Sequence, residues 1–209
     1  MDLDKICRAF KRNRFDCTIF ETAEEAAAYL SQEIHDKTVG MGDSMTLENM
    51  KMYERLSENN EVYDVQHIEN KDYTSKERTE QFLSMARKCL MTDVFLTSAN
   101  AASETGELVN IDGTGNRVAA MMFGPKKVIL IAGINKLAAD EESALRRVKQ
   151  EACPPNCIRL GKKTPCAVTG ECGNCLTPGQ TICSYTVSTR FSPEKDRLHV
   201  ILVNDILGF

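Results

Sequence analysis

The chain contains 209 residues with a formal net charge of −4, and 42% of its residues are hydrophobic and 27% charged. This length suits one well-cored domain, and the acidic balance argues against a nucleic-acid-binding protein, which usually carries a basic face. The N-terminus lacks the apolar stretch of a secretory signal, and the longest apolar run, at 128–134, is too short to span a membrane. Nine cysteines in such a chain favour reduced thiols or metal ligands over disulfides. We therefore expect a cytoplasmic protein.

The first half of the chain alternates between helical and strand patterns. Apolar residues within the first ten positions recur at helical spacing, and capping boxes from Thr22 to Glu25 and from Thr74 to Glu77 predict two further helix starts. The predicted order is a helix at 3–10, a helix at 22–34, a strand and glycine turn at 37–44, a helix at 45–58, a strand at 61–68, a helix at 74–90 and a strand at 93–99. Such alternation indicates βαβ units.

The second half begins with a different pattern. Turn residues at 112–115 predict a β-hairpin over 104–123, and Asp140 is expected to cap a helix. The other predicted elements are a buried strand at 126–134, a helix at 140–152, an irregular cysteine segment and closing strands at 184–191 and 197–207. We therefore predict an α/β fold with an open, mostly parallel sheet flanked by helices. It would form a single domain over 1–209 with an embedded cysteine-rich insertion at 153–183.

Four cysteines of this insertion are predicted to bind one metal centre: Cys166, Cys172, Cys175 and Cys183. Two of them form a CxxC motif, and the surrounding Gly/Pro-rich segment has too few apolar residues to form a core, so that a metal would supply ordering energy. The alternative is four free thiols on a loop. Both zinc and a [4Fe–4S] cluster suit the spacing, with a slight preference for iron–sulfur. Cys153 and Cys157 are either alternative ligands, a thiol pair, or two small residues in a turn.

The glycine turn after the strand near residue 40 has the composition of an anion site. Backbone N–H groups from Gly40 to Gly42, with hydroxyls from Ser44 and Thr46, would bind a phosphate or carboxylate. Asp43 would repel an anion unless it binds a hydroxyl or caps the helix. The alternative is a capped strand–helix turn without a ligand.

Polar side chains also follow the strands at 93–99 and 126–134. The candidate ligand-binding residues are Thr97, Ser98, Asn100, Thr105, Gly106, Asn110, Asn116, Arg117, Gly133, Asn135 and Lys136. Because ligands bind beyond the carboxyl ends of parallel strands, we expect these groups to converge with the glycine turn. Glu104 or Glu107 would be a general base or nucleophile, and Arg117 would hold a carboxylate or phosphate. The alternative is a polar loop and hairpin that satisfy their own backbone.

Three stretches carry a resemblance to a known family: GMGDSMTL at 40–47, TSANAASETGELVNIDGTGNRVAA at 97–120 and GPKKVILIAGINKLAADEESALRRV at 124–148. They resemble the LUD-domain family, which includes lactate-utilisation protein C, over about the first 160 residues. The resemblance implies a fold like those of ribose-phosphate isomerase and the CoA transferases, and a role in oxidising lactate to pyruvate alongside iron–sulfur partners. It implies a phosphate-type loop at 40–46 and a catalytic edge near Glu104 and Glu107. The cysteine-rich segment departs from protein C and indicates a separate branch.

Three functions follow from these features. The favoured one is a redox accessory in the utilisation of lactate or another small carboxylate, working with iron–sulfur oxidoreductase subunits. The second is an enzyme acting on a phosphorylated or carboxylate metabolite, with a structural metal. The third is a non-catalytic docking subunit. A homodimer is compatible with each.

Overall fold

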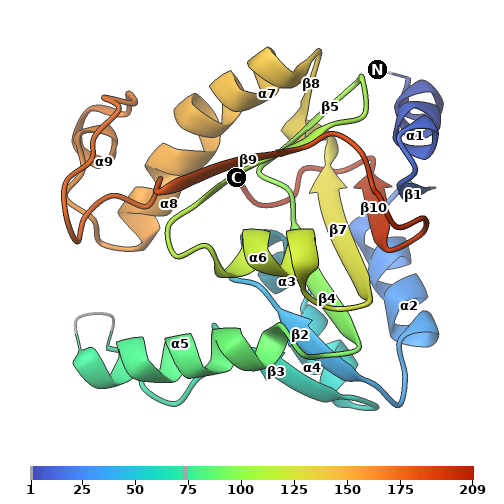
Figure 1. The fold of residues 1–209 in the computed structure, drawn as a ribbon, viewed down its shortest axis with the longest axis horizontal. Coiled ribbons are helices and arrows are strands. Elements are labelled where there is room, and N and C mark those ends of the chain that lie inside the picture. Colours follow the sequence, from blue (N-terminus) through green and yellow to red (C-terminus); the bar gives the residue numbers. More distant parts are fainter. Residues whose placement is uncertain (1, 73–74) are drawn as a thin grey trace.

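A computed structural model describes residues 2–72 and 75–209, and its main feature is a six-stranded sheet (Figure 1). In spatial order the strands are β1 (Asp16–Phe20), β10 (Leu198–Val203), β7 (Lys127–Gly133), β4 (Val94–Ser98), β2 (Thr38–Met41) and β3 (Glu61–Asp64). All five neighbouring pairs are parallel. The predicted α/β class with a mostly parallel sheet is therefore confirmed.

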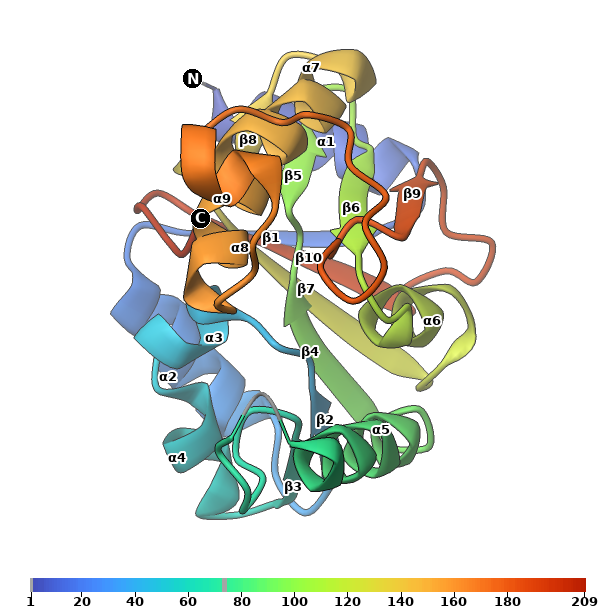
Figure 2. The same cartoon turned by 90° about the vertical axis from the view of Figure 1, so that its left-hand side faces the viewer.

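Helices cover both faces of this sheet (Figure 2). One face packs against α1 (Leu3–Arg12), α5 (Lys76–Cys89) and α6 (Asn116–Phe123), and the other against α2 (Ala23–Glu33), α3 (Met45–Asn49) and α4 (Met52–Ser57). Along β7, Val128 and Leu130 enter the first core while Ile129 and Ile131 enter the second, as the alternation of side chains along a strand requires. None of the helices in the described ranges is long and apolar enough to cross a membrane.

A second, four-stranded sheet continues from the carboxyl ends of β4 and β7. Its strands in spatial order are β8 (Leu137–Ala138), β5 (Ala101–Ser103), β6 (Leu108–Asp112) and β9 (Tyr185–Thr189). Ala102 and Leu108 pack into the core of the main sheet, whereas Val109 and Ile111 pack against α7 (Glu141–Arg147). The second sheet therefore closes over the edge of the main sheet at which parallel strands usually bind ligands.

Two predicted elements that precede the cysteine segment differ from the structure. The single helix over 45–58 is divided into α3 and α4, because Lys51 adopts a left-handed conformation with φ of 53°. The hairpin predicted around 112–115 is wrong, since those residues lead into α6: Asp112 Oδ1 accepts hydrogen bonds from the N–H groups of Thr114 and Gly115. The observed hairpin joins β5 to β6 and turns at Gly106, whose φ is 94°.

The cysteine segment is more helical than its composition predicts. Helix α7 continues through a π-helical turn, η2 (Val148–Ala152), into α8 (Cys153–Arg159), and α9 (Pro165–Thr169) follows. The predicted caps at Thr22 and Asp140 are confirmed. Helix α5 is capped by Ser75, whereas the predicted cap Thr74 lies outside the described residues.

Candidate functional site

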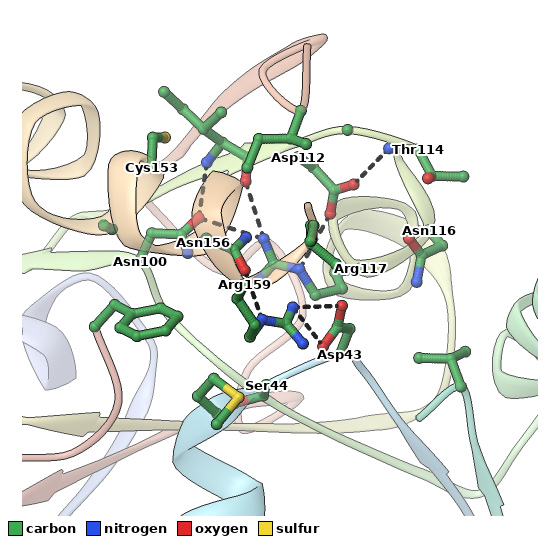
Figure 3. A pocket seen from close by; sticks show the side chains of 18 of the residues that line it. Asp43, Ser44, Asn100, Asp112, Thr114, Asn116, Arg117, Cys153, Asn156 and Arg159 are labelled. Carbon is green, nitrogen blue, oxygen red and sulfur yellow. Dashed lines mark hydrogen bonds and ion pairs between the residues drawn. The ribbon is translucent and has the colours of Figure 1, made fainter. Parts of the chain in front are cut away.

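A cavity of about 420 Å³ lies where the two sheets meet α8 (Figure 3). Eight of the predicted ligand-binding residues line it: Asp43, Ser44, Thr46, Ser98, Asn100, Asn116, Arg117 and Lys136. They come from the glycine turn, from the end of β4, from the start of α6 and from η1 (Ile134–Lys136), the 3₁₀ turn after β7. The expected convergence of polar groups beyond three strands is therefore observed.

Arg117 is held in a fixed orientation at the wall of the cavity. Its Nη1 donates to the carbonyl of Ser98 (3.3 Å), and its Nη2 donates to the carbonyl of Ile111 (3.0 Å) and to Asn100 Oδ1 (3.3 Å). Its Nε lies 3.3 Å from Asp112 Oδ2, and both side chains are largely buried. Asp112 therefore offsets the charge of Arg117, and the carbonyls fix the plane of the guanidinium.

Lys136 is a buried ammonium without a carboxylate beside it. The residue is only 3% exposed, and its Nζ donates to Thr46 Oγ1 at 2.7 Å. Burial, reinforced by the positive charges of Arg147 and Arg117, lowers the pKa of Lys136 to about 7. Within residues 2–72 and 75–209 no acidic side chain forms an ion pair with it. Thus positive charge at this point of the cavity is not offset by the protein.

Asp43, the acidic residue in the glycine turn, is neutralised from α8. Arg159 Nη2 donates to both Asp43 carboxylate oxygens, at 3.0 and 2.8 Å, while its Nε donates to Asn156 Oδ1 at 2.9 Å. Figure 3 shows the guanidinium groups of Arg159 and Arg117 pointing into the cavity. The sequence gives no signal for Arg159, because its partner is distant in the chain and its segment was predicted to be irregular.

The remaining predicted site residues do not line this cavity: Gly40, Gly42, Thr97, Glu104, Thr105, Gly106, Glu107, Asn110, Gly133 and Asn135. The structure places Glu104 and Glu107 in the turn between β5 and β6, at the end that packs against Ala9 of α1. The Glu107 carboxylate accepts hydrogen bonds from the hydroxyls of Ser103 and Thr105. Because β4 runs on into the second sheet, these acids are carried away from the edge where they were expected.

Gly42 supports the site through its small size. A Cβ at this position would lie 3.0 Å from Arg117 Cγ and 3.0 Å from Thr97 Oγ1. That separation is tighter than ordinary van der Waals contact, so a larger residue would displace the arginine. Gly42 therefore contributes by leaving room for Arg117, and this packing role could not be read from the loop pattern.

A smaller cavity of about 110 Å³ adjoins the first one. Six cysteines line it: Cys153, Cys157, Cys166, Cys172, Cys175 and Cys183. The Sγ atoms of Cys153 and Cys183 are 3.6 Å apart, and those of Cys157 and Cys166 are 3.7 Å apart. Among the described residues, no three His, Cys, Asp or Glu side chains are arranged to hold one metal ion. The predicted ligands Cys166 and Cys183 therefore each have a thiol neighbour outside the predicted set, and Cys153 lines both cavities.

The two members of one thiol pair differ in acidity. The hydrogen bond with Cys153 lowers the pKa of Cys183 to about 7, against the opposing effect of burial and with help from Lys149. The same hydrogen bond, together with burial, raises the pKa of Cys153. Cys183 is therefore the thiol that ionises first in this pair.

These features define an α/β protein with an open parallel sheet and a polar, cation-lined cavity at its carboxyl edge. The chain belongs to the LUD-domain family, whose sequence model matches residues 3–203 and so extends beyond the first 160 residues. Among solved structures it is similar to a DUF162 family protein from Deinococcus radiodurans, with 13% identity over 98% of this chain and 99% of that one and a TM-score of 0.50. It also matches ribose 5-phosphate isomerase A from Neisseria gonorrhoeae, with 15% identity, 62% and 63% coverage and a TM-score of 0.34. No curated protein matches the chain.

Proposed function

We propose that this LUD-domain protein binds a small carboxylate or a phosphorylated metabolite in the 420 Å³ cavity. The observation that carries the proposal is Lys136, a buried ammonium with no acidic partner in the described part of the chain. An unpaired buried charge is expensive, by several kcal/mol, and an anionic ligand would supply the missing partner. Burial and the positive charges of Arg147 and Arg117 lower the pKa of Lys136, and a bound anion would raise it again.

The other polar groups of the cavity suit the same ligand class. Arg117 and Arg159 present guanidinium groups, and both are already paired with acids, so Lys136 leaves an excess of positive charge. Ser44 and Thr46 add hydroxyls at the same wall. The cavity volume is within the range of roughly 300–1,000 Å³ that is usual for small-molecule sites. A monoanion or dianion of metabolite size therefore fits both charge and space.

Titration calorimetry with lactate and with inorganic phosphate tests this proposal. We expect at least one of them to bind the wild-type chain, and Lys136→Met to weaken that binding by at least about tenfold, or roughly 1.4 kcal/mol. Lys126→Met is the matched control, because it removes an exposed lysine outside the cavity. Equal affinities in the wild type and Lys136→Met, or no binding of either anion at millimolar concentration, would overturn it.

We further propose that the cysteine cavity holds a metal centre, an iron–sulfur cluster or zinc. The support is that six cysteines line one small space that shares Cys153 with the anion cavity. With a cluster, the chain would act as a redox accessory in the use of lactate or another small carboxylate, exchanging electrons with iron–sulfur oxidoreductase subunits. Metal and sulfide analysis of anaerobically purified protein tests this, and metal-free protein after reconstitution would exclude it.

A catalytic role is the second candidate, and Lys136 is the residue that favours it. A lysine with a pKa near neutrality has a large fraction of free amine, which can attack a carbonyl or accept a proton. With pyruvate, the amine would add to the carbonyl carbon, water would leave, and borohydride would reduce the imine to a stable secondary amine. Mass spectrometry should locate this adduct on Lys136. An unmodified Lys136 after treatment would count against covalent catalysis by this residue.

A further inference from the structure

The cysteines of the smaller cavity are organised in pairs. Cys153 and Cys157 stand four residues apart on α8, so they lie on one face and one turn apart. Each faces a cysteine from the chain that follows: Cys183 at 3.6 Å from Cys153, and Cys166 at 3.7 Å from Cys157. Cys153, Cys157 and Cys166 are buried, Cys183 and Cys175 are half-buried, and Cys172 is exposed. Three of the four paired thiols are therefore buried, whereas neither cysteine of the CxxC motif is.

The separation within each pair is that of two thiolates on one metal. With metal–sulfur bonds of about 2.3 Å and tetrahedral angles, two such sulfurs lie about 3.75 Å apart. A disulfide would bring them to about 2 Å. One ion bound by all four sulfurs would need them to converge on one point, but no three Cys, His, Asp or Glu side chains among the described residues are placed to hold one ion. The pairs therefore suit two metal ions side by side.

We propose that Cys153, Cys157, Cys166 and Cys183 bind a [2Fe–2S] cluster. Cys153 and Cys183 would hold one iron, and Cys157 and Cys166 the other. In a [4Fe–4S] cluster each iron binds one thiolate, so the four cysteine sulfurs are not expected to lie in close pairs. During assembly, four thiols release four protons as their sulfurs bind two ferric ions bridged by two sulfide ions.

This inference rests on the proposed metal centre and does not require anion binding, although Cys153 lines both cavities. It replaces Cys172 and Cys175 of the CxxC motif, which the spacing in the sequence favours, with the two cysteines of α8. Lys149 also lines the cysteine cavity, where its ammonium would offset part of the cluster's negative charge. Cys172 and Cys175 would then lie outside the coordination sphere.

Reconstitution of the full chain with iron and sulfide under anaerobic conditions tests the assignment. Because both ligand sets contain Cys166 and Cys183, the informative variants are Cys157→Ser and its matched control, Cys175→Ser. We expect wild type and Cys175→Ser to hold about two irons and two sulfides per chain, and Cys157→Ser to lose both. Cluster loss in Cys175→Ser with retention in Cys157→Ser would overturn the proposal.

The stoichiometry of the wild type gives a second readout that does not depend on the folding of a variant. About four irons and four sulfides per chain would overturn the assignment, as would one zinc without sulfide, although a metal centre would still exist. Metal-free protein with two disulfides would overturn both this inference and the proposed metal centre. Loss of lactate or phosphate binding with two irons present would refute only the anion proposal. Anion binding by the apo form of Cys157→Ser verifies its fold, because Cys157 does not line the anion cavity.

Discussion

Replacing Lys136 with methionine is expected to stabilise the fold while it weakens anion binding. Methionine keeps most of the length of the side chain but carries no charge into the buried position. The pKa of Lys136 falls from 10.5 to about 7 because burial and two nearby arginines disfavour the ammonium. At about 1.36 kcal/mol per pKa unit, this drop corresponds to about 5 kcal/mol of destabilisation of the charged form. Loss of the hydrogen bond to Thr46 offsets about 1 kcal/mol of the gain.

The gain should depend on pH in a defined direction. Below about pH 7 both the folded and the unfolded chain carry the proton on Lys136, so the wild type bears the full penalty. Between about pH 7 and pH 10.5 only the unfolded chain binds that proton, so the stability of the wild type rises with pH. The penalty is then about 2 kcal/mol near pH 9, and the advantage of the variant should shrink by about 3 kcal/mol between pH 6 and pH 9.

Urea unfolding of wild type, Lys136→Met and the exposed-site control Lys126→Met near both pH values measures this difference. A stability difference between wild type and Lys136→Met that does not change with pH would refute the assignment of a buried, charge-destabilised lysine. A pH-dependent difference in Lys126→Met would show that the effect is not specific to the cavity. The comparison uses only differences between variants, so the constant hydrogen-bond contribution cancels.

Two further substitutions test other parts of the site. Arg159→Ala should weaken phosphate binding by about tenfold in calorimetry, because it leaves the Asp43 carboxylate unneutralised beside the ligand. Adding Asp43→Asn should restore part of the affinity. Unchanged phosphate binding in Arg159→Ala would contradict this role. Gly40→Ala should destabilise the fold by about 1–3 kcal/mol in urea unfolding, because the added Cβ would lie 2.9 Å from Cys89 Cβ and 2.9 Å from Thr92 Oγ1. An unchanged free energy of unfolding would show that the packing around Gly40 relaxes.

The main sheet could be predicted from the sequence because its strands carry their own signal. The apolar runs of β7 and β10 are buried along almost their whole length, and such runs between turn residues are typical of central parallel strands. Thr22 and Asp140 likewise give local hydrogen-bonding patterns that fix helix starts. Each of these signals lies within a few residues of the element it specifies.

The parts that were not predicted depend on contacts between distant segments. The rule that polar groups gather beyond strand ends identified Ser98 and Lys136, but it also selected Glu104 and Glu107. Those acids were misplaced because β4 continues through Ala99 into a second sheet, and no local pattern distinguishes such a continuation from a loop. The helical state of the cysteine segment was missed for a related reason, since its cysteines and prolines are poor helix formers outside the context of α7.

The shared wall of the two cavities connects the two proposals physically. Four residues line both spaces, namely Ile111, Cys153, Thr181 and Ile182, so a charge in one cavity interacts electrostatically with a charge in the other. A cluster that gains an electron would become more negative and would weaken anion binding beside Lys136. By thermodynamic linkage, a bound anion would then make the cluster harder to reduce by the same coupling free energy. Anion affinity measured on oxidised and reduced protein, set against the reduction potential with and without ligand, should therefore give one coupling value from two experiments.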